Sequence, residues 1–173
     1  MPEVINKNNF SFDYYIYEYI KDLPKKICFL EPNNITIFNY FITFFIIYLI
    51  YNDKSLFIIV LFVLFRTFLD ILDGSIARKC NKGTKLGTKL DIFGDGLFLN
   101  LLLYTFYLKS TNKNIKLLFL LLFIYGLLMS INLCFNYDYL YENNFMEFFH
   151  DNTIISVPFS VLLGIYLINP KNA

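Results

Sequence analysis

Tryptophan is absent from the 173-residue chain, histidine occurs once, cysteine occurs three times, and the net charge is only +1. The balanced charge gives no support for nucleic-acid binding, which needs an excess of basic residues. Cys28, Cys80 and Cys134 have neither paired nor metal-ligand spacing, so we expect free thiols in a reducing compartment. His150 stands alone in an acidic stretch, and we expect no catalytic role for it.

Polar residues are also scarce, because 57% of the chain is hydrophobic and only 17% is charged. A soluble domain of this length has too little interior to hide so much apolar surface. We therefore expect lipid to be the main solvent. The fold class that this predicts is all-α, in the form of a polytopic, integral membrane helix bundle.

Five apolar stretches provide the expected membrane spans, each of which needs roughly 20 residues to cross the hydrocarbon core. They cover residues 35–51, 55–69 with a helical continuation to 78, 87–108, 115–135 and 154–168. Residues 136–151 contain four acidic side chains and form a loop, a surface helix or a short, degenerate span. We therefore predict five to six transmembrane helices within a domain of residues 32–173.

Residues 1–31 form an N-terminal juxtamembrane segment in this prediction. They lack the compact basic and apolar regions of a cleaved signal peptide. Residues 10–20 are aromatic and amphipathic, and Lys21, Lys25 and Lys26 follow them. This pattern is typical of an amphipathic helix on the membrane surface, although a packed extension of the domain fits it too.

Four aspartates lie at the junction of the second and third apolar stretches. Asp70 and Asp73 are three residues apart, and Asp91 and Asp95 are four apart, so each pair shares one face of a helix. Carboxylates beside a membrane core are costly, and four together repel one another unless a cation lies between them. Because all the ligands are oxygen atoms, we expect a hard divalent ion, Mg²⁺ or Mn²⁺.

The segment that holds these aspartates resembles the signature of the CDP-alcohol phosphotransferase family, class I, which reads D-x2-D-G-x2-A-R-x8-G-x3-D-x3-D. A weaker similarity precedes it, because residues 32–36 read P-N-N-I-T and the family has P-N-x-[IL]-T there. The resemblance implies a membrane phosphatidyltransferase that moves a phosphatidyl group from CDP-diacylglycerol to the hydroxyl of a small alcohol and releases CMP. The signature positions are filled by Asp70, Asp73, Gly74, Ala77, Arg78, Gly87, Asp91 and Asp95.

The resemblance also assigns roles to individual residues. Asp70, Asp73 and Asp91 would bind the metal, and Asp95 would be both a ligand and the general base for the acceptor hydroxyl. A metal-bound carboxylate is a weak base, so Asp95 must be held loosely by the metal. The residues expected to contact the nucleotide or CDP-lipid are Gly74, Ala77, Arg78, Thr84 and Gly87.

Structural alternatives remain open for several of these residues. Gly74 also suits close helix packing, Arg78 an interfacial anchor, and Thr84 an ordinary turn. Arg66 lies one helical turn before Asp70 inside the second apolar stretch. We expect it to pair with Asp70, with an acceptor phosphate or a lipid as its alternative partner.

The basic turn at residues 79–85 and the N-terminal lysines favour an active site that faces the cytosol. The expected partners are CDP-diacylglycerol, a small alcohol and membrane lipids, with no nucleic acid, and a homodimer is left open. Asn39 leans toward serine as the acceptor, whereas the basic turn leans toward inositol, so serine, inositol and glycerol phosphate all remain. The alternative functions are a non-catalytic membrane protein with a cation site and an inactive family member.

Overall fold

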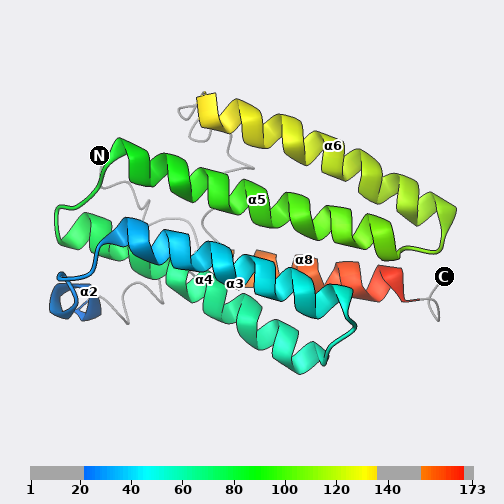
Figure 1. The fold of residues 1–173 in the computed structure, drawn as a ribbon, viewed down its shortest axis with the longest axis horizontal. Helices are drawn as coiled ribbons and strands as arrows, with labels where there is room; N and C mark the ends of the chain where they lie inside the picture. The colour runs from blue at the N-terminus through cyan, green and yellow to red at the C-terminus, as the bar shows by residue number, and fades with distance from the viewer. Residues whose placement is uncertain (1–21, 136–152, 170–173) are drawn as a thin grey trace, which may run out of the picture.

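The computed structural model describes residues 22–135 and 153–169, and every regular element within them is an α-helix (Figure 1). The predicted all-α fold is therefore confirmed for these residues, and each of the five apolar stretches forms a helix. The surface helix expected at residues 10–20, the acidic segment 136–151 and His150 lie outside the described residues. The helices are α2 (Leu23–Lys26), α3 (Pro32–Tyr51), α4 (Leu56–Lys79), α5 (Lys85–Lys109), α6 (Lys113–Phe135) and α8 (Thr153–Ile168).

Helix ends are fixed by local chemistry near the aspartates. Pro32 opens α3 at the first helical position, where a missing backbone N–H is tolerated. Asn81 has a φ of 54° in the turn that follows α4. Thr84 then caps α5, because its hydroxyl oxygen accepts a hydrogen bond from the Gly87 N–H at 2.9 Å. This short turn joins the two halves of the aspartate motif at one end of the bundle.

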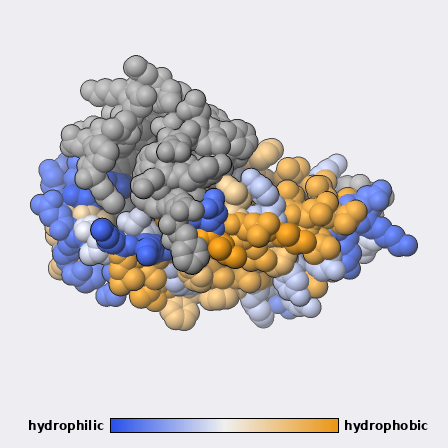
Figure 2. All heavy atoms as spheres, turned by 90° about the horizontal axis from the view of Figure 1, so that it is seen from above, coloured by the Kyte–Doolittle hydropathy of each residue, from blue (hydrophilic) through white to orange (hydrophobic). Residues whose placement is uncertain are grey.

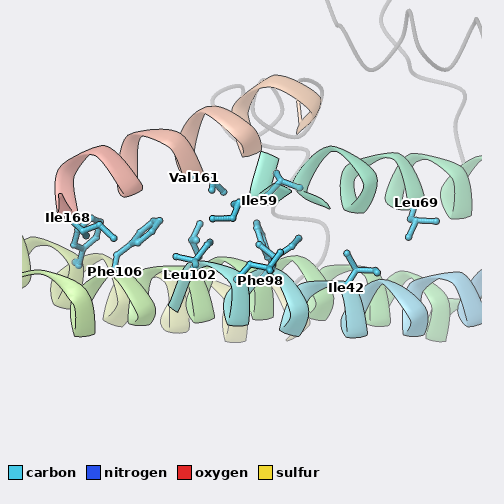
Figure 3. Packing of buried hydrophobic residues seen from close by; sticks show 13 residues of the cluster. Ile42, Ile59, Leu69, Phe98, Leu102, Phe106, Val161 and Ile168 are labelled. Carbon is cyan, nitrogen blue, oxygen red and sulfur yellow. The ribbon is translucent and has the colours of Figure 1, made fainter. Parts of the chain in front are cut away.

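Helix α3 packs against both α4 and α5, α6 lies along the outer side of α5, and α8 packs on α4 and α5 (Figure 1). The core that they share is apolar: Phe98, Leu102 and Phe106 of α5 point toward Ile59 and Val161 (Figure 3). Because the core lies mainly in the middle of the bundle, the aspartates are left at one end of it.

The outer surface is largely apolar, and Figure 2 shows an apolar band between two hydrophilic ends. Phe41, Phe57 and Leu128 are among the large side chains that it exposes, at 66%, 76% and 63%. By length and composition, two helical segments can cross a membrane, Pro32–Tyr51 and Lys113–Asn132, and Ser156–Ile168 is a shorter apolar helix. The five-span arrangement stays a prediction.

Cys28 and Cys80 form a disulfide, so the prediction of free thiols was wrong for this pair. They are 52 residues apart in sequence, but their Cα atoms are only 5.7 Å apart. The reason is topological: α3 and α4 are antiparallel neighbours, which brings the segment before α3 against the end of α4. The side chain of Cys134 lies outside the described part of the chain.

Candidate active site

Four carboxylates come together where the end of α4 meets the first half of α5. Asp73 experiences repulsion from Asp70 and Asp95, and Asp91 experiences repulsion from Asp73 and Asp95. Helix α3 packs against both helices, and its Thr36 and Tyr40 make hydrogen bonds beside this group. The structure thus places the predicted metal ligands within electrostatic range of one another, while no three of them are grouped as a metal site in the part of the chain that it describes.

Asp73 is the most enclosed member of the cluster, with 3% of its surface exposed. Its Oδ2 accepts a hydrogen bond of 2.7 Å from the Thr36 hydroxyl on α3. Thr36 is itself buried and also lies 3.2 Å from the Pro32 carbonyl oxygen. A charged acceptor makes this hydrogen bond stronger than one between neutral groups, so Thr36 fixes Asp73 relative to α3.

Asp95 lies at the open side of the cluster, where 51% of its side chain is exposed. Its Oδ1 is 2.8 Å from Nη2 of Arg66, which reaches it from α4. The prediction named Asp70 as the partner of Arg66 and missed Asp95, although Asp70 does attract Arg66 electrostatically. The long arginine side chain reaches across the interface between α4 and α5, a contact that spacing along one helix does not reveal.

Asp91 has a buried Oδ1 without a hydrogen-bond partner. Arg66 and Arg78 both attract this carboxylate. A buried oxygen that lacks a partner is unfavourable unless something else satisfies it, so the cluster fits a bound cation. Within residues 22–135 and 153–169 no three acidic, His or Cys side chains are grouped as a metal site. Asp73 accepts a hydrogen bond from Thr36, and Asp95 accepts one from Arg66.

The signature residues Gly74 and Arg78 lie together on the last turns of α4. A Cβ at Gly74 would be 3.2 Å from Nη1 of Arg78, so the guanidinium group covers the glycine. Gly74 therefore leaves room for the Arg78 side chain. This favours a packing role for Gly74 over a direct contact with the nucleotide. Arg78 is exposed, and its charge attracts the Asp91 carboxylate.

The residues at the start of α5 have structural contacts of their own. A Cβ at Gly87 would be 2.7 Å from Oδ1 of Asn33, so this glycine allows the start of α3 to approach α5. Thr84 makes the capping hydrogen bond to Gly87, and its hydroxyl is exposed. Ala77 is half-buried, and its carbonyl oxygen accepts a hydrogen bond from the Lys82 N–H at 2.9 Å.

Tyr40 and Asn39 of α3 were not among the predicted metal, catalytic or CDP-lipid residues, although Asn39 was linked to the choice of acceptor. The Tyr40 hydroxyl donates a hydrogen bond of 2.5 Å to the carbonyl oxygen of Leu90, the residue before Asp91. Gly94 leaves space for the Tyr40 ring, because a Cβ there would be 2.6 Å from Cε1. Asn39 is 3% exposed, and its Oδ1 has no hydrogen-bond partner.

Residues 29–168 match the family model described as CDP-alcohol phosphatidyltransferase, a range that includes every helix around the cluster. The chain belongs to this family. It is also 38% identical over 93 residues to the CDP-diacylglycerol–glycerol-3-phosphate 3-phosphatidyltransferase of Aquifex aeolicus (strain VF5), covering 53% of this chain and 51% of the relative. The chain thus spans about half the length of this curated relative. No solved structure matches it.

Membership of the CDP-alcohol phosphatidyltransferase family confirms the resemblance that the aspartate signature indicated. The signature does not include the residues that hold its members in place. Thr36 contacts Asp73, Tyr40 holds the backbone before Asp91, and Arg66 contacts Asp95. Thr36 ends the P-N-N-I-T segment, and Arg66 was expected to pair with an aspartate of the motif, whereas no sequence signal indicated Tyr40.

Proposed function

We propose that the chain is an integral-membrane CDP-alcohol phosphatidyltransferase that transfers a phosphatidyl group from CDP-diacylglycerol to a small alcohol and releases CMP. The observation that carries the proposal is the convergence of four carboxylates, with a partnerless Oδ1 on Asp91, beside the exposed Arg78. Family membership supports the same reaction class.

Asp70, Asp73, Asp91 and Asp95 would hold the divalent ion, Mg²⁺ or Mn²⁺. When bound, this ion neutralises pyrophosphate charge and stabilises the departing CMP. The donor set supports this assignment, since it consists only of carboxylate oxygens. Two of these carboxylates would have to turn toward the ion from their present partners, Thr36 and Arg66.

Asp95 is the residue that we propose as the general base. It is the exposed carboxylate of the cluster, so an acceptor hydroxyl can approach it from solvent. The hydroxyl oxygen attacks the phosphorus of the phosphatidyl group, its proton passes to Asp95, and the bond between that phosphorus and the CMP oxygen breaks. Arg78 would pair its guanidinium group with phosphate oxygens of the CDP-lipid.

The surface supports a membrane location in which α3, α4, α5, α6 and α8 all span the bilayer. The apolar band (Figure 2) provides the lipid-facing surface, and exposed lysines gather at the site end, at positions 79, 85 and 89. By the positive-inside bias this end faces the cytosol. The disulfide at the same end favours the opposite orientation, because disulfides persist in oxidising compartments outside the cytosol. We propose the cytosolic orientation, because the basic residues act on topology while the helices are being inserted.

The acceptor is a small alcohol, and the name of the Aquifex relative makes glycerol 3-phosphate the first one to test. The test is CMP release from CDP-diacylglycerol by the purified protein in detergent with Mn²⁺, with glycerol 3-phosphate, inositol and serine as separate acceptors. We expect release with one acceptor and none in EDTA.

Asp95→Asn is the matched variant for this assay, because it keeps the side-chain size and removes the base. Loss of a general base lowers the rate by about 10²- to 10⁴-fold. Asp70→Asn should instead weaken Mn²⁺ and CDP-lipid binding together, which a thermal shift with CDP-lipid would report. If Asp95→Asn turns over at the wild-type rate, the general base is another residue. If the wild-type protein releases no CMP with any acceptor, a non-catalytic cation site is the function that remains.

A further inference from the structure

Arg66 is a buried charge in the middle of the bundle, with 3% of its surface exposed. Two other helices, α3 and α5, provide its contacts. Nε donates a hydrogen bond of 3.2 Å to the Thr43 hydroxyl on α3, and Nη2 donates to the Gly94 carbonyl oxygen on α5 at 3.5 Å. Its guanidinium carbon also lies 4.4 Å from the centre of the Phe98 ring. The position of this cation is therefore fixed by groups other than the carboxylate it pairs with.

The ion pair with Asp95 is unequal in its exposure to solvent. The side chain of Arg66 is 4% exposed, whereas that of Asp95 is 51% exposed. Water can hydrate Asp95 without Arg66, but Arg66 has no comparable access to water. Arg66 is thus the fixed member of the pair, and the ion pair sets the direction in which the Asp95 carboxylate points.

Arg66 also affects the net charge of the aspartate cluster. Asp95, Asp70 and Asp91 all attract it. Repulsion between the carboxylates opposes their approach from α4 and α5, and Arg78 offsets part of it at Asp91. A fixed positive charge between the helices reduces that repulsion.

We propose that Arg66 is the resident counter-cation of the aspartate cluster and the positioning residue of Asp95. It holds Asp95 against α4 and keeps the carboxylates together before a divalent ion binds. The inference rests on the proposed function for the identity of that ion. The contact between Arg66 and Asp95 can be tested without ion or turnover.

A double-mutant cycle in detergent with EDTA tests the contact. Arg66→Gln removes the buried cation of a pair whose carboxylate is half exposed, so it should lower the melting temperature by about 5–10 °C, less than the loss of a fully buried pair. Asp95→Asn should also lower it, because Arg66 then stays buried without its partner. The double variant should lose much less than the sum of the two, since residues in contact do not behave additively.

Asp70→Asn provides the matched control for the cycle. Asp70 is the other carboxylate within one turn of Arg66, so its coupling to Arg66→Gln should be smaller than that of Asp95. Additive losses for Arg66 and Asp95, or stronger coupling to Asp70, overturn the proposal. If Arg66→Gln does not fold by itself, folding of the double variant with Asp95→Asn supports the proposal, and failure of both overturns it.

Mn²⁺ without CDP-lipid tests the counter-cation role. Arg66→Gln should gain a larger increase in melting temperature from Mn²⁺ than the wild type, because the metal replaces a missing positive charge. Thr67→Val is the control for a disturbed core, since Thr67 is buried on the same helix and its hydroxyl donates to the Val63 carbonyl oxygen of that helix, at 3.0 Å. Its response to Mn²⁺ should equal that of the wild type.

If the wild type responds to Mn²⁺ and Arg66→Gln responds equally or less, the counter-cation role is overturned. If no variant responds to Mn²⁺, the metal site of the proposed function is wrong. The cycle in EDTA then decides whether Arg66 positions Asp95, so the two failures are distinguishable.

Discussion

Thr36 and Asp73 join α3 to α4 through one hydrogen bond inside the site. The bond matters because Asp73 is almost fully buried, and a buried carboxylate needs a donor or a cation. The other carboxylates of the cluster do not provide one. Thr36 thus stabilises the fold and sets the direction of a proposed metal ligand at the same time.

Thr36→Val should lower the free energy of unfolding by about 1.5–3 kcal/mol, the range for a hydrogen bond to a charged group. Turnover should fall as well, because Asp73 loses its fixed direction. Thermal or denaturant unfolding and CMP release measure the two effects. Thr105→Val is the matched control, since Thr105 is equally buried but donates only to the Leu101 carbonyl oxygen of its own helix. If both variants behave alike, the contact with Asp73 has no special role.

At the scale of the helices, close approach depends on glycines at the interfaces. Gly94 admits the Tyr40 ring, Gly96 admits Ser130, and Gly164 lets α8 lie against Phe106 of α5. Small residues at such contacts allow helix backbones to approach, which is the usual means of packing where lipid surrounds a bundle. Asn100 adds a polar contact between α5 and α6, a hydrogen bond of 3.0 Å to the Ser130 hydroxyl.

Gly164→Ala should destabilise the protein even though alanine favours the helical backbone by about 1 kcal/mol. A Cβ at this position would overlap the ring of Phe106, which is 1% exposed and packs against Phe119. Overpacking of this kind costs about 1–3 kcal/mol, and a trapped ring places the cost at the upper end. The measurement is the melting temperature in detergent.

Gly83→Ala provides the comparison, because its Cβ would meet nothing closer than the Ala77 carbonyl oxygen at 3.8 Å. This variant should melt within a few degrees of the wild type. Unchanged stability of Gly164→Ala would mean that α8 does not pack against α5 as described.

The positions of the helices and the aspartate cluster could be predicted from the sequence, but the contacts between helices could not. Apolar stretches and fixed spacing act along the chain, so they located α3 to α6, α8 and the four aspartates. The pairing of Arg66 with Asp95 depends on the relative rotation of α4 and α5. The Cys28–Cys80 disulfide depends likewise on two antiparallel helices that bring distant residues together. Neither relation is encoded by spacing within one helix.

For the whole molecule, the remaining question is which end of the bundle faces the cytosol. The exposed Lys85 marks the site end, and the exposed Lys54 lies in the turn between α3 and α4 at the opposite end. If α3 spans the bilayer, these two positions lie on opposite sides of it, because a helix of 20 residues is about 30 Å long. Lys82 is less suitable as a probe, since it forms an ion pair of 2.6 Å with Glu31.

Single cysteines at these two positions, in a background with Ser at residues 28, 80 and 134, decide the orientation through a membrane-impermeant thiol reagent. We expect Lys85→Cys to react only from the cytosolic side and Lys54→Cys only from the opposite side, as the lysines at the site end require. The reverse pattern would place the site in the compartment where the Cys28–Cys80 disulfide persists, and CDP-lipid would then have to reach it from there. Reaction of both positions from the same side would instead refute a membrane-spanning α3.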